Sequence, residues 1–261
     1  MVKKDVPTNQ ATFLGTGTSQ GIPVVACNCE VCSSKDLRDK RLRSSLLVTI
    51  GSTNLVIDAG PDFRQQMLTE KVGSLRAILL THEHVDHIFG LDDIRSFNWI
   101  QKNPMEIYAE ERVQHAIKRI FNYVFADHKY PGIPKMHLMK VDGSPFVIEQ
   151  IKIIPIRCFH HKLPVYGYRI GDLTYITDTN SIPDKELDKI LGSRILVINA
   201  LRKEPHISHF NLGEALQVIE RVKPEKAYLT HVSHGFGKHV DIEKELPENV
   251  FMAYDGLKLE F

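Results

Sequence analysis

The sequence predicts a single α/β domain, and three observations support this fold class. Short apolar runs typical of strands alternate with amphipathic stretches typical of helices almost to the end of the chain. No low-complexity linker interrupts the 261 residues. The hydrophobic content of 43% and the charged content of 25% are ordinary for a folded globular protein, which excludes the disordered and fibrous classes. We therefore expect one domain over residues 1–261.

The expected strands are short runs rich in aliphatic and β-branched residues. In chain order they are LLVTI (46–50), LVIDAG (55–60), AILLT (77–81), KIIPIRC (152–158), LTYITD (173–178), ILVINA (195–200) and KAYLTH (226–231). The expected helices are DFRQQMLTE (62–70), one long pattern over 111–125, and NLGEALQVIERVK (211–223). Asn211 is expected to cap the last helix, which ends before Pro224.

Charge and hydropathy limit the partners of the chain. With 33 basic and 32 acidic residues the formal net charge is +1, so no strong field attracts nucleic acid. No run approaches the ~18 apolar residues that span a bilayer, and the start MVKKDVPTNQ lacks the apolar core of a signal peptide. We therefore expect a cytoplasmic protein that acts on neither membranes nor nucleic acids.

The residues THEHVDH (81–87) carry the strongest functional signal. They place His82, His84, Asp86 and His87 directly after the expected strand AILLT. Neutral imidazole is the commonest nitrogen ligand of divalent metals, and these donors are more than one ion can accept from a short loop. A second Thr-His pair ends the strand KAYLTH. We therefore expect two metal ions, held where two histidine-bearing strand ends meet at one edge.

Three of the four cysteines lie within CNCEVC (27–32). Closely spaced cysteines in a reducing compartment bind metal more often than they form disulfides. Cys27, Cys29 and Cys32 would need one further donor to close a tetrahedral structural zinc site. Cys158 or a histidine could supply that donor, and the spacing alone does not choose between them.

The HxHxDH turn after LVIDAG resembles the signature of the metallo-β-lactamase fold. That fold is an αββα sandwich of two mixed β-sheets flanked by helices, with a two-metal site at the sheet edges. The resemblance covers nearly the whole chain. FLGTGTSQGIP, CNCEVC, HHKLPVYGY, YITDT, SHFNLGEAL, THVSH and the late DG at 255–256 more narrowly resemble the PhnP-like phosphodiesterases of the carbon-phosphorus lyase pathway, which hydrolyse phosphoribosyl 1,2-cyclic phosphate.

The resemblance implies a set of metal ligands. One active-site ion, manganese or zinc, would bind His82, His84 and His160, with His161 as the alternative to His160. The other ion would bind Asp86, His87 and His231, and Asp178 would bridge the two. The family pattern also selects His234 as the fourth ligand of a structural zinc, beside Cys27, Cys29 and Cys32. This zinc would hold an N-terminal loop of about 15–35.

Catalytic and supporting roles are also implied. A hydroxide bridging the two ions is the expected nucleophile. His209 is the expected general acid, with His206 as its alternative, and Asp86 is expected to act in catalysis as well as in metal binding. Asp58 is expected to hold a ligand histidine by its other ring nitrogen, and Asp255 to support the site from further out. The aromatic segment of about 121–137 is expected to form a cap over the site.

The expected function is therefore a binuclear metal-dependent phosphodiesterase that acts on a small cyclic or nucleotide-like phosphodiester. A tRNA 3′-end processing endonuclease shares the ligand set, but a near-neutral chain without a basic Gly-Pro-rich insertion offers RNA little to bind. A non-catalytic PqqB-like cofactor-biosynthesis protein shares the cysteine cluster, and the complete ligand set argues against it. A homodimer is the assembly that we expect, if the chain assembles at all.

Overall fold

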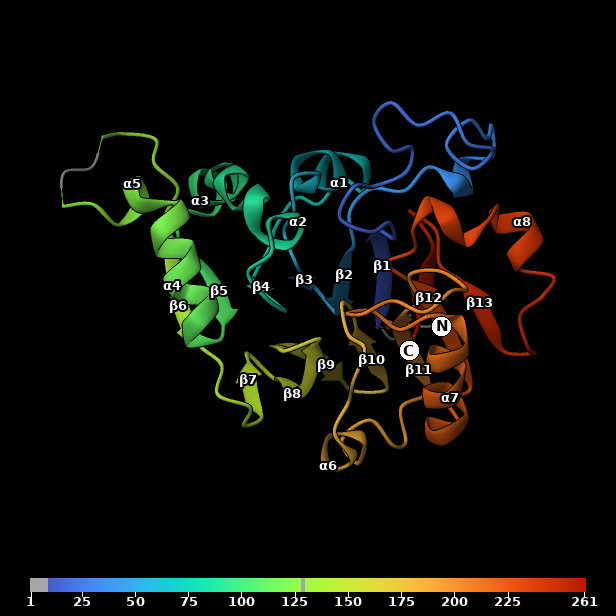
Figure 1. Ribbon diagram of the computed structural model, residues 1–261. Helices are drawn as coiled ribbons and strands as arrows, with labels where there is room; N and C mark the ends of the chain where they lie inside the picture. The colour runs from blue at the N-terminus through green and yellow to red at the C-terminus, as the bar shows by residue number, and fades with distance from the viewer. Residues whose placement is uncertain (1–8, 128–129) are drawn as a thin grey trace, which may run out of the picture.

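Two β-sheets lie face to face, and helices cover their outer surfaces, so that the layers follow the order helix, sheet, sheet, helix (Figure 1). The computed structural model describes residues 9–127 and 130–261. Each sheet contains seven strands within these residues. The expected αββα sandwich with two mixed sheets is confirmed.

The first sheet has the strand order β14-β1-β2-β3-β4-β5-β6. Its pairs from β14 to β3 are antiparallel, and its pairs from β3 to β6 are parallel. The strands are β1 (Gln10–Gly15), β2 (Ser45–Ile50), β3 (Thr53–Ile57), β4 (Ala77–Leu79), β5 (Met105–Ala109), β6 (Met136–Lys140) and β14 (Lys258–Glu260). The parallel half matters for function, because it directs the ends of β3 and β4 to the same edge.

The second sheet has the strand order β13-β12-β11-β10-β9-β8-β7. Its pairs from β7 to β10 are antiparallel, and its pairs from β10 to β13 are parallel. The strands are β7 (Phe146–Ile148), β8 (Ile151–His160), β9 (Leu163–Ile170), β10 (Leu173–Ile176), β11 (Ile195–Asn199), β12 (Lys226–Thr230) and β13 (Val250–Met252). The ends of β10, β11 and β12 therefore also share one edge.

The helices are short, and most of them follow a parallel strand. Those associated with the first sheet are α1 (Phe63–Thr69), α2 (Val85–Ile88), α3 (Arg95–Gln101), α4 (Glu111–Ile120) and α5 (Asn122–Phe125). Those associated with the second sheet are α6 (Asp184–Leu187), α7 (Leu212–Val222) and α8 (His239–Ile242). Three 3₁₀ helices, η1 (Leu37–Asp39), η2 (Phe89–Ile94) and η3 (His234–Phe236), complete the described elements.

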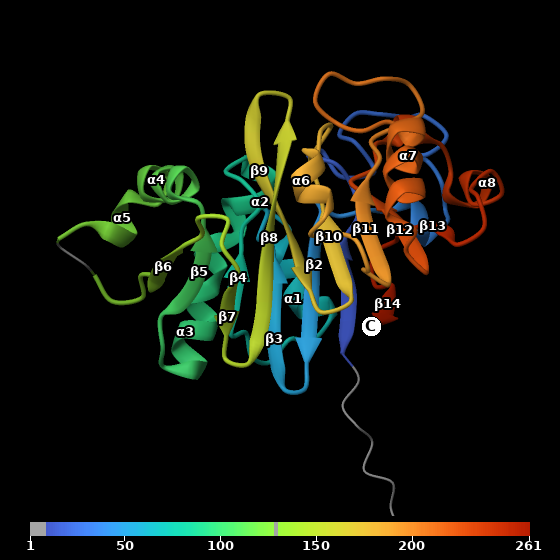
Figure 2. The same ribbon diagram turned by 90° about the horizontal axis from the view of Figure 1, so that it is seen from below.

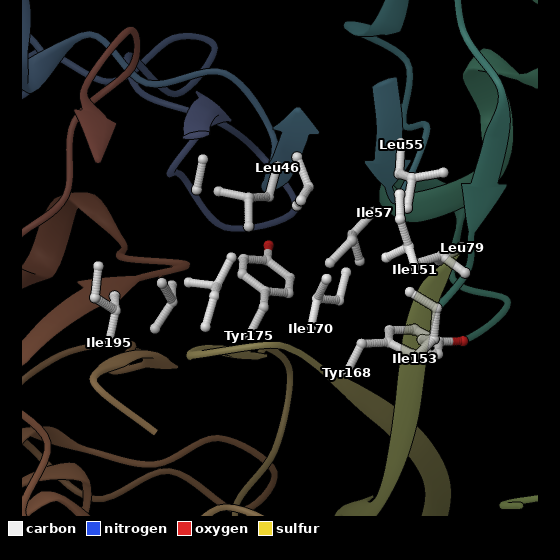
Figure 3. Close-up of a cluster of buried hydrophobic side chains, with 14 of the residues drawn as sticks. Leu46, Leu55, Ile57, Leu79, Ile151, Ile153, Tyr168, Ile170, Tyr175 and Ile195 are labelled. Atoms are coloured by element: carbon white, nitrogen blue, oxygen red, sulfur yellow. The ribbon is translucent and has the colours of Figure 1, made fainter. Parts of the chain in front are cut away.

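The main hydrophobic core lies between the two sheets. Leu46, Leu55 and Leu79 from the first sheet face Tyr168 and Tyr175 from the second (Figure 3). Further buried clusters lie between each sheet and its helices. Each fully buried large apolar side chain contributes about 1.5–3 kcal/mol to stability. The three hydrophobic clusters therefore form a stable frame for the loops at the sheet edges.

The helix predictions are confirmed at two of three places. Residues 62–70 contain α1, and α7 begins after Asn211, which forms a capping box with Glu214 and accepts a hydrogen bond from its backbone N–H at 2.9 Å. The single helix expected over 111–125 is wrong. The chain leaves the helical conformation at Phe121 (φ −102°, ψ 44°), whose buried ring packs into the core and separates α4 from α5.

The segment of about 121–137, expected to cap the site, includes residues 128–129, which lie outside the described residues. Its described part contacts α3. The Asn98 side chain donates to the Lys135 carbonyl at 3.1 Å and accepts from the Lys135 N–H at 2.8 Å. The capping role therefore stays a prediction. Within residues 9–127 and 130–261, no helix has the length and apolar character that a bilayer crossing requires.

Candidate metal centre and catalytic site

The histidine and aspartate side chains of interest lie in loops that follow strands of both sheets. THEHVDH follows β4, His160 ends β8, Asp178 follows β10 and His231 follows β12. Two of these residues have a left-handed backbone, with φ of 53° at Asp178 and 56° at His231. Non-glycine residues adopt this conformation at a cost of about 1–2 kcal/mol. Strained residues that cluster in this way are typical of functional sites.

Asp178 lies at the centre of the site. Its Oδ1 is 3.4 Å from His87 Nε2 and 3.0 Å from His231 Nδ1, while its Oδ2 is 3.8 Å from His82 Nε2. The two oxygens of one buried carboxylate thus face histidines of two different groups. Such an arrangement suits a carboxylate that bridges two cations.

Three overlapping groups of donor atoms form around Asp178. Within each group the donor atoms lie within 4.8 Å of one another. The groups are Asp86, His87, Asp178 and His231; His82, His84 and Asp178; and His160, Asp178 and His209. The first two groups contain six of the seven expected ligands, and His160 joins through the third. His161 belongs to none of these groups among the described residues, so the geometry places His160 in the cluster.

Asp58 controls one histidine in each of the first two groups. Its Oδ2 accepts a hydrogen bond from His87 Nδ1 at 2.7 Å and another from the Thr81 hydroxyl at 2.9 Å. Because that hydroxyl donates to Asp58, it must accept from His82 Nδ1, 2.9 Å away. Both imidazoles therefore present Nε2 to the cluster. Asp58, directly and through Thr81, thus has the position expected of a residue that holds a ligand histidine by its other ring nitrogen.

The electrostatics of the cluster favour cations. Burial works against a charged His87, but the carboxylates of Asp178, Asp86 and Asp58 outweigh this effect and raise its pKa well above the usual value. Burial instead lowers the pKa of His82 well below its usual value. The buried His87 Nε2 has no hydrogen-bond partner within the described residues. A metal ion would replace the proton that the carboxylates attract and would satisfy this nitrogen.

His209 lies against the cluster, and His206 lies further out. The His209 ring stacks on His231 with ring centroids 5.1 Å apart and meets the His160 ring edge-on at 4.5 Å. Burial lowers the pKa of His209 to about 3. His206 reaches the cluster only through His209, at a centroid distance of 5.1 Å. Of the two alternatives, His209 has the position from which a proton could reach a substrate on the cluster.

The cysteines of CNCEVC converge on a single histidine. Cys27, Cys29 and Cys32 place Sγ at 3.3, 3.4 and 3.6 Å from His234 Nδ1. In a tetrahedral zinc site the edge between a sulfur and a nitrogen ligand is about 3.6 Å. Cys158 is fully buried in β8 and lies outside this group. Of the donors that the spacing left open, the structure groups His234, and not Cys158, with the three cysteines.

The loop that carries these cysteines also contacts the segment that follows β12. The Thr18 hydroxyl is 3.2 Å from His231 Nε2, and the Thr18 N–H donates to the Val232 carbonyl at 3.0 Å. His234 begins η3 three residues after His231. A metal at the cysteine site would hold the loop and the segment that carries His231 in a fixed relation.

We expect Cys29→Ser to release one zinc ion per chain, because an alcohol is a poorer zinc ligand than a thiolate. The hydrogen bond from the Cys32 N–H is the main cause that lowers the pKa of Cys29, to about 6, which favours the thiolate. Elemental analysis of purified protein measures the loss, and Cys158→Ala serves as a control that should keep all metal. The pH dependence of residual turnover should not change. Full metal content in Cys29→Ser would mean that the thiols serve another purpose.

Asp255 supports the same loop from its other side. Its carboxylate accepts hydrogen bonds from the Thr16 hydroxyl at 2.7 Å and from the Leu42 N–H at 2.6 Å. Burial raises its pKa to about 6. Asp255 belongs to none of the donor groups among the described residues, and its hydrogen bonds join it to Thr16, two residues before Thr18, and to Leu42.

Sequence reasoning missed the polar contacts that come from distant segments. The Ser44 hydroxyl is 3.1 Å from His231 Nδ1. Arg112 of α4 pairs with Glu83, the residue between His82 and His84, and donates to the Pro164 carbonyl at 2.5 Å. No local signal marks these residues, because serine and arginine are common throughout the chain.

Comparisons with known proteins agree with this geometry. A model of the Beta-lactamase superfamily domain matches residues 53–232. The chain therefore belongs to the beta-lactamase superfamily, a class of proteins with the metallo-β-lactamase fold. Within that class, the crystal structure of a new diphosphatase from the PhnP family is 38% identical, covers 97% of both chains and has a TM-score of 0.91. The Zn²⁺-bound PqqB of Methylobacterium extorquens shares the fold at 19% identity and a TM-score of 0.78, over 97% of this chain and all of that one.

Curated relatives are longer than the matched region. An octanoyltransferase of Porphyromonas gingivalis is 40% identical over 94% of this chain but only 50% of its own length. A ribonuclease Z of Prochlorococcus marinus is 27% identical over 62% of this chain and 49% of its own length. The chain thus spans about half the length of the curated relatives that it matches.

Proposed function

We propose that the protein is a binuclear metal-dependent phosphodiesterase that hydrolyses a small cyclic or nucleotide-like phosphodiester of the phosphoribosyl 1,2-cyclic phosphate type. The observation that carries this proposal is the position of Asp178, whose two oxygens face histidines of two donor groups. The chain belongs to the beta-lactamase superfamily, and the similar structure from the PhnP family is that of a diphosphatase, which supports an activity on phosphate groups.

The donor set fits two divalent ions. His82, His84 and His160 would hold one, Asp86, His87 and His231 would hold the other, and Asp178 would bridge them. Imidazole with carboxylate donors suits manganese or zinc. When bound, the two ions would supply a hydroxide nucleophile at neutral pH and neutralise the phosphoryl oxygens. A third zinc would occupy the site of Cys27, Cys29, Cys32 and His234, as the sulfur to nitrogen distances permit.

The side chains around the ions would orient the metal ligands and supply the proton that the reaction needs. Asp58 and Thr81 keep His82 and His87 in the tautomers that present Nε2. His209 would donate a proton to the leaving alkoxide, which is a poor leaving group without one. Burial lowers the pKa of His209 to about 3, which disfavours the protonated ring before a substrate binds. The negative charge of a bound phosphodiester would raise that pKa and let the ring acquire the proton.

An RNA-processing activity is the second candidate, because several curated relatives are ribonuclease Z proteins. The near-neutral charge of the chain gives it little non-specific affinity for a polyanion. We therefore propose a small-molecule substrate and no nucleic-acid partner. A homodimer and a cytoplasmic location stay predictions, and a non-catalytic role like that expected of a PqqB-like protein is the outcome if no substrate turns over.

One assay separates these functions. Purified protein with its metals counted is tested on bis(p-nitrophenyl) phosphate, phosphoribosyl 1,2-cyclic phosphate, cyclic nucleotides, a nucleoside diphosphate ester and pre-tRNA. We expect hydrolysis of the small diesters, loss of activity on treatment with a chelator, and recovery with manganese or zinc. Cleavage of pre-tRNA without cleavage of any small diester would contradict the proposal, as would full activity after the metals are removed.

A further inference from the structure

His84 differs from the other histidines of the cluster in how its ring is held. The rings of four of them contact a polar atom outside the donor groups: His82 contacts Thr81, His87 contacts Asp58, His160 contacts the Ser208 carbonyl and His231 contacts Ser44. His84 is exposed, and within residues 9–127 and 130–261 its ring has a hydrogen-bond partner only in His82, at 2.9 Å. Because a ligand histidine is usually oriented through its other ring nitrogen, the position of His84 depends on its backbone.

Glu83 and Arg112 anchor that backbone. Glu83 lies between His82 and His84 in the loop after β4, and its Oε1 accepts a hydrogen bond from Arg112 Nη1 of α4. The side chains of Arg112 and Glu83 are only 32% and 22% exposed. Water and salt screen a partly buried ion pair less than a surface pair, so this contact can hold the loop against α4.

The same arginine also holds the hairpin that carries His160. Arg112 Nη2 donates to the Pro164 carbonyl at 2.5 Å, and Pro164 pairs with Phe159 in the ladder between β8 and β9, one residue before His160. The helices α2 and α4 and the turn between β8 and β9 lie at the same end of the molecule (Figure 2). The planar fork of a guanidinium can serve two acceptors at once. Arg112 therefore joins the loop after β4 to this hairpin.

Further polar contacts fix Arg112 in turn. Its Nη2 is 3.5 Å from Glu110 Oε2, and Glu110 accepts hydrogen bonds from Arg157 at 2.7 and 3.1 Å. The Arg157 guanidinium lies 3.8 Å from the centre of the Tyr166 ring. The Tyr166 N–H donates to the Thr81 carbonyl at 3.1 Å. The network thus returns to the first residue of THEHVDH, so α4, the hairpin and this loop form one connected structure.

The contacts of Arg112 involve the ligands of one of the two ions. We call the ion that His82, His84 and His160 would hold the first ion, and the ion that Asp86, His87 and His231 would hold the second ion. We propose that Arg112 is a positioning residue that sets the affinity of the protein for the first ion. The inference rests on the two-ion site of the proposed function. The histidines of the second ion make hydrogen bonds with Asp58 and Ser44 instead.

A titration with Mn²⁺ tests this role. Protein that keeps zinc at its cysteine site is freed of active-site ions by a mild chelator and titrated in a calorimeter. Because thiolates select zinc whereas carboxylates suit manganese, the heat reports the active site. We expect wild type to bind two ions. Arg112→Met should raise Kd for the first ion by about 10- to 100-fold and Kd for the second by less than about threefold. Hydrolysis of bis(p-nitrophenyl) phosphate should recover as Mn²⁺ is raised.

Three further variants assign the effect. In a His84→Ala background the first ion is already weakened, so adding Arg112→Met should cost less than it does in wild type, because both changes act on one site. Arg112→Lys keeps the charge but can serve only one of the two acceptors well, so its Kd should lie between those of wild type and Arg112→Met. Arg119→Met removes an exposed arginine of the same helix and should leave both Kd values unchanged.

The outcomes for Arg112 and for the function are distinguishable. Unchanged binding of both ions by Arg112→Met, or equal weakening of both, would overturn the positioning role, even if diesters are cleaved and the proposed function stands. If Arg112→Met weakens one ion selectively but the wild type cleaves no diester, the proposed function fails and the positioning role is supported. Thermal unfolding checks each variant, and Arg112→Lys decides the question if Arg112→Met does not fold.

Discussion

Asp178→Asn should abolish most activity, with a loss of roughly 10²–10³-fold in kcat/KM on bis(p-nitrophenyl) phosphate. The substitution keeps the shape of the side chain but removes the charge that faces both histidine groups. Removing one partner from a buried charged network costs about 3–5 kcal/mol, and the lower part of this range corresponds to about 10²–10³-fold in rate or affinity. We also expect at least one active-site ion to be lost, as measured by elemental analysis.

Asp172→Asn is the control for this experiment. Asp172 precedes β10 in the same part of the chain, is about half exposed and forms only a loose pair with Arg194 at 3.6 Å. Its replacement should change neither metal content nor rate. An Asp178→Asn protein that keeps both ions and more than a tenth of the activity would show that Asp178 does not bridge.

The second large effect is expected for His209→Ala. A general acid contributes about 10²–10⁴-fold, and this contribution is needed only when the leaving group is a poor one. We expect a loss in this range on cyclic phosphates and alkyl diesters, and a loss below about tenfold on p-nitrophenyl esters, whose leaving group departs without a proton. Rates measured on both kinds of substrate at one pH provide the comparison.

His206→Ala distinguishes the roles of the two loop histidines. Among the described residues, the His206 ring packs against His209, which in turn contacts the cluster. His206→Ala should cost little on either kind of substrate. A donor atom of His209 also lies within 4.8 Å of donor atoms of His160 and Asp178, so the metal content of His209→Ala must be counted. If His209→Ala keeps its metal and loses activity only on substrates with alkoxide leaving groups, the role of His209 as general acid is supported. Equal losses on both substrates would remove it, and loss of an ion would make His209 a ligand.

Local patterns in the sequence predicted the fold class and seven of the fourteen strands that the described residues contain. Strand propensity identified β3, β4, β10, β11 and β12 of the two parallel halves but not β5, β6 or β13, and the capping residue Asn211 marked the start of α7. The break at Phe121 was missed, because the helical periodicity continues through it. Burial of that ring in the core is a tertiary effect that overrides helix propensity.

The sequence by itself determined the chemistry of the site. THEHVDH and CNCEVC hold their donors within a few residues of one another, so that no fold could separate them widely. Only the tertiary structure decided the rest. It placed His160 rather than His161 in the cluster, and it joined the cysteines to His234 and not to Cys158. Each of these contacts joins segments that are far apart in the chain, and their meeting depends on which strand ends share an edge, a property of packing that no local pattern carries.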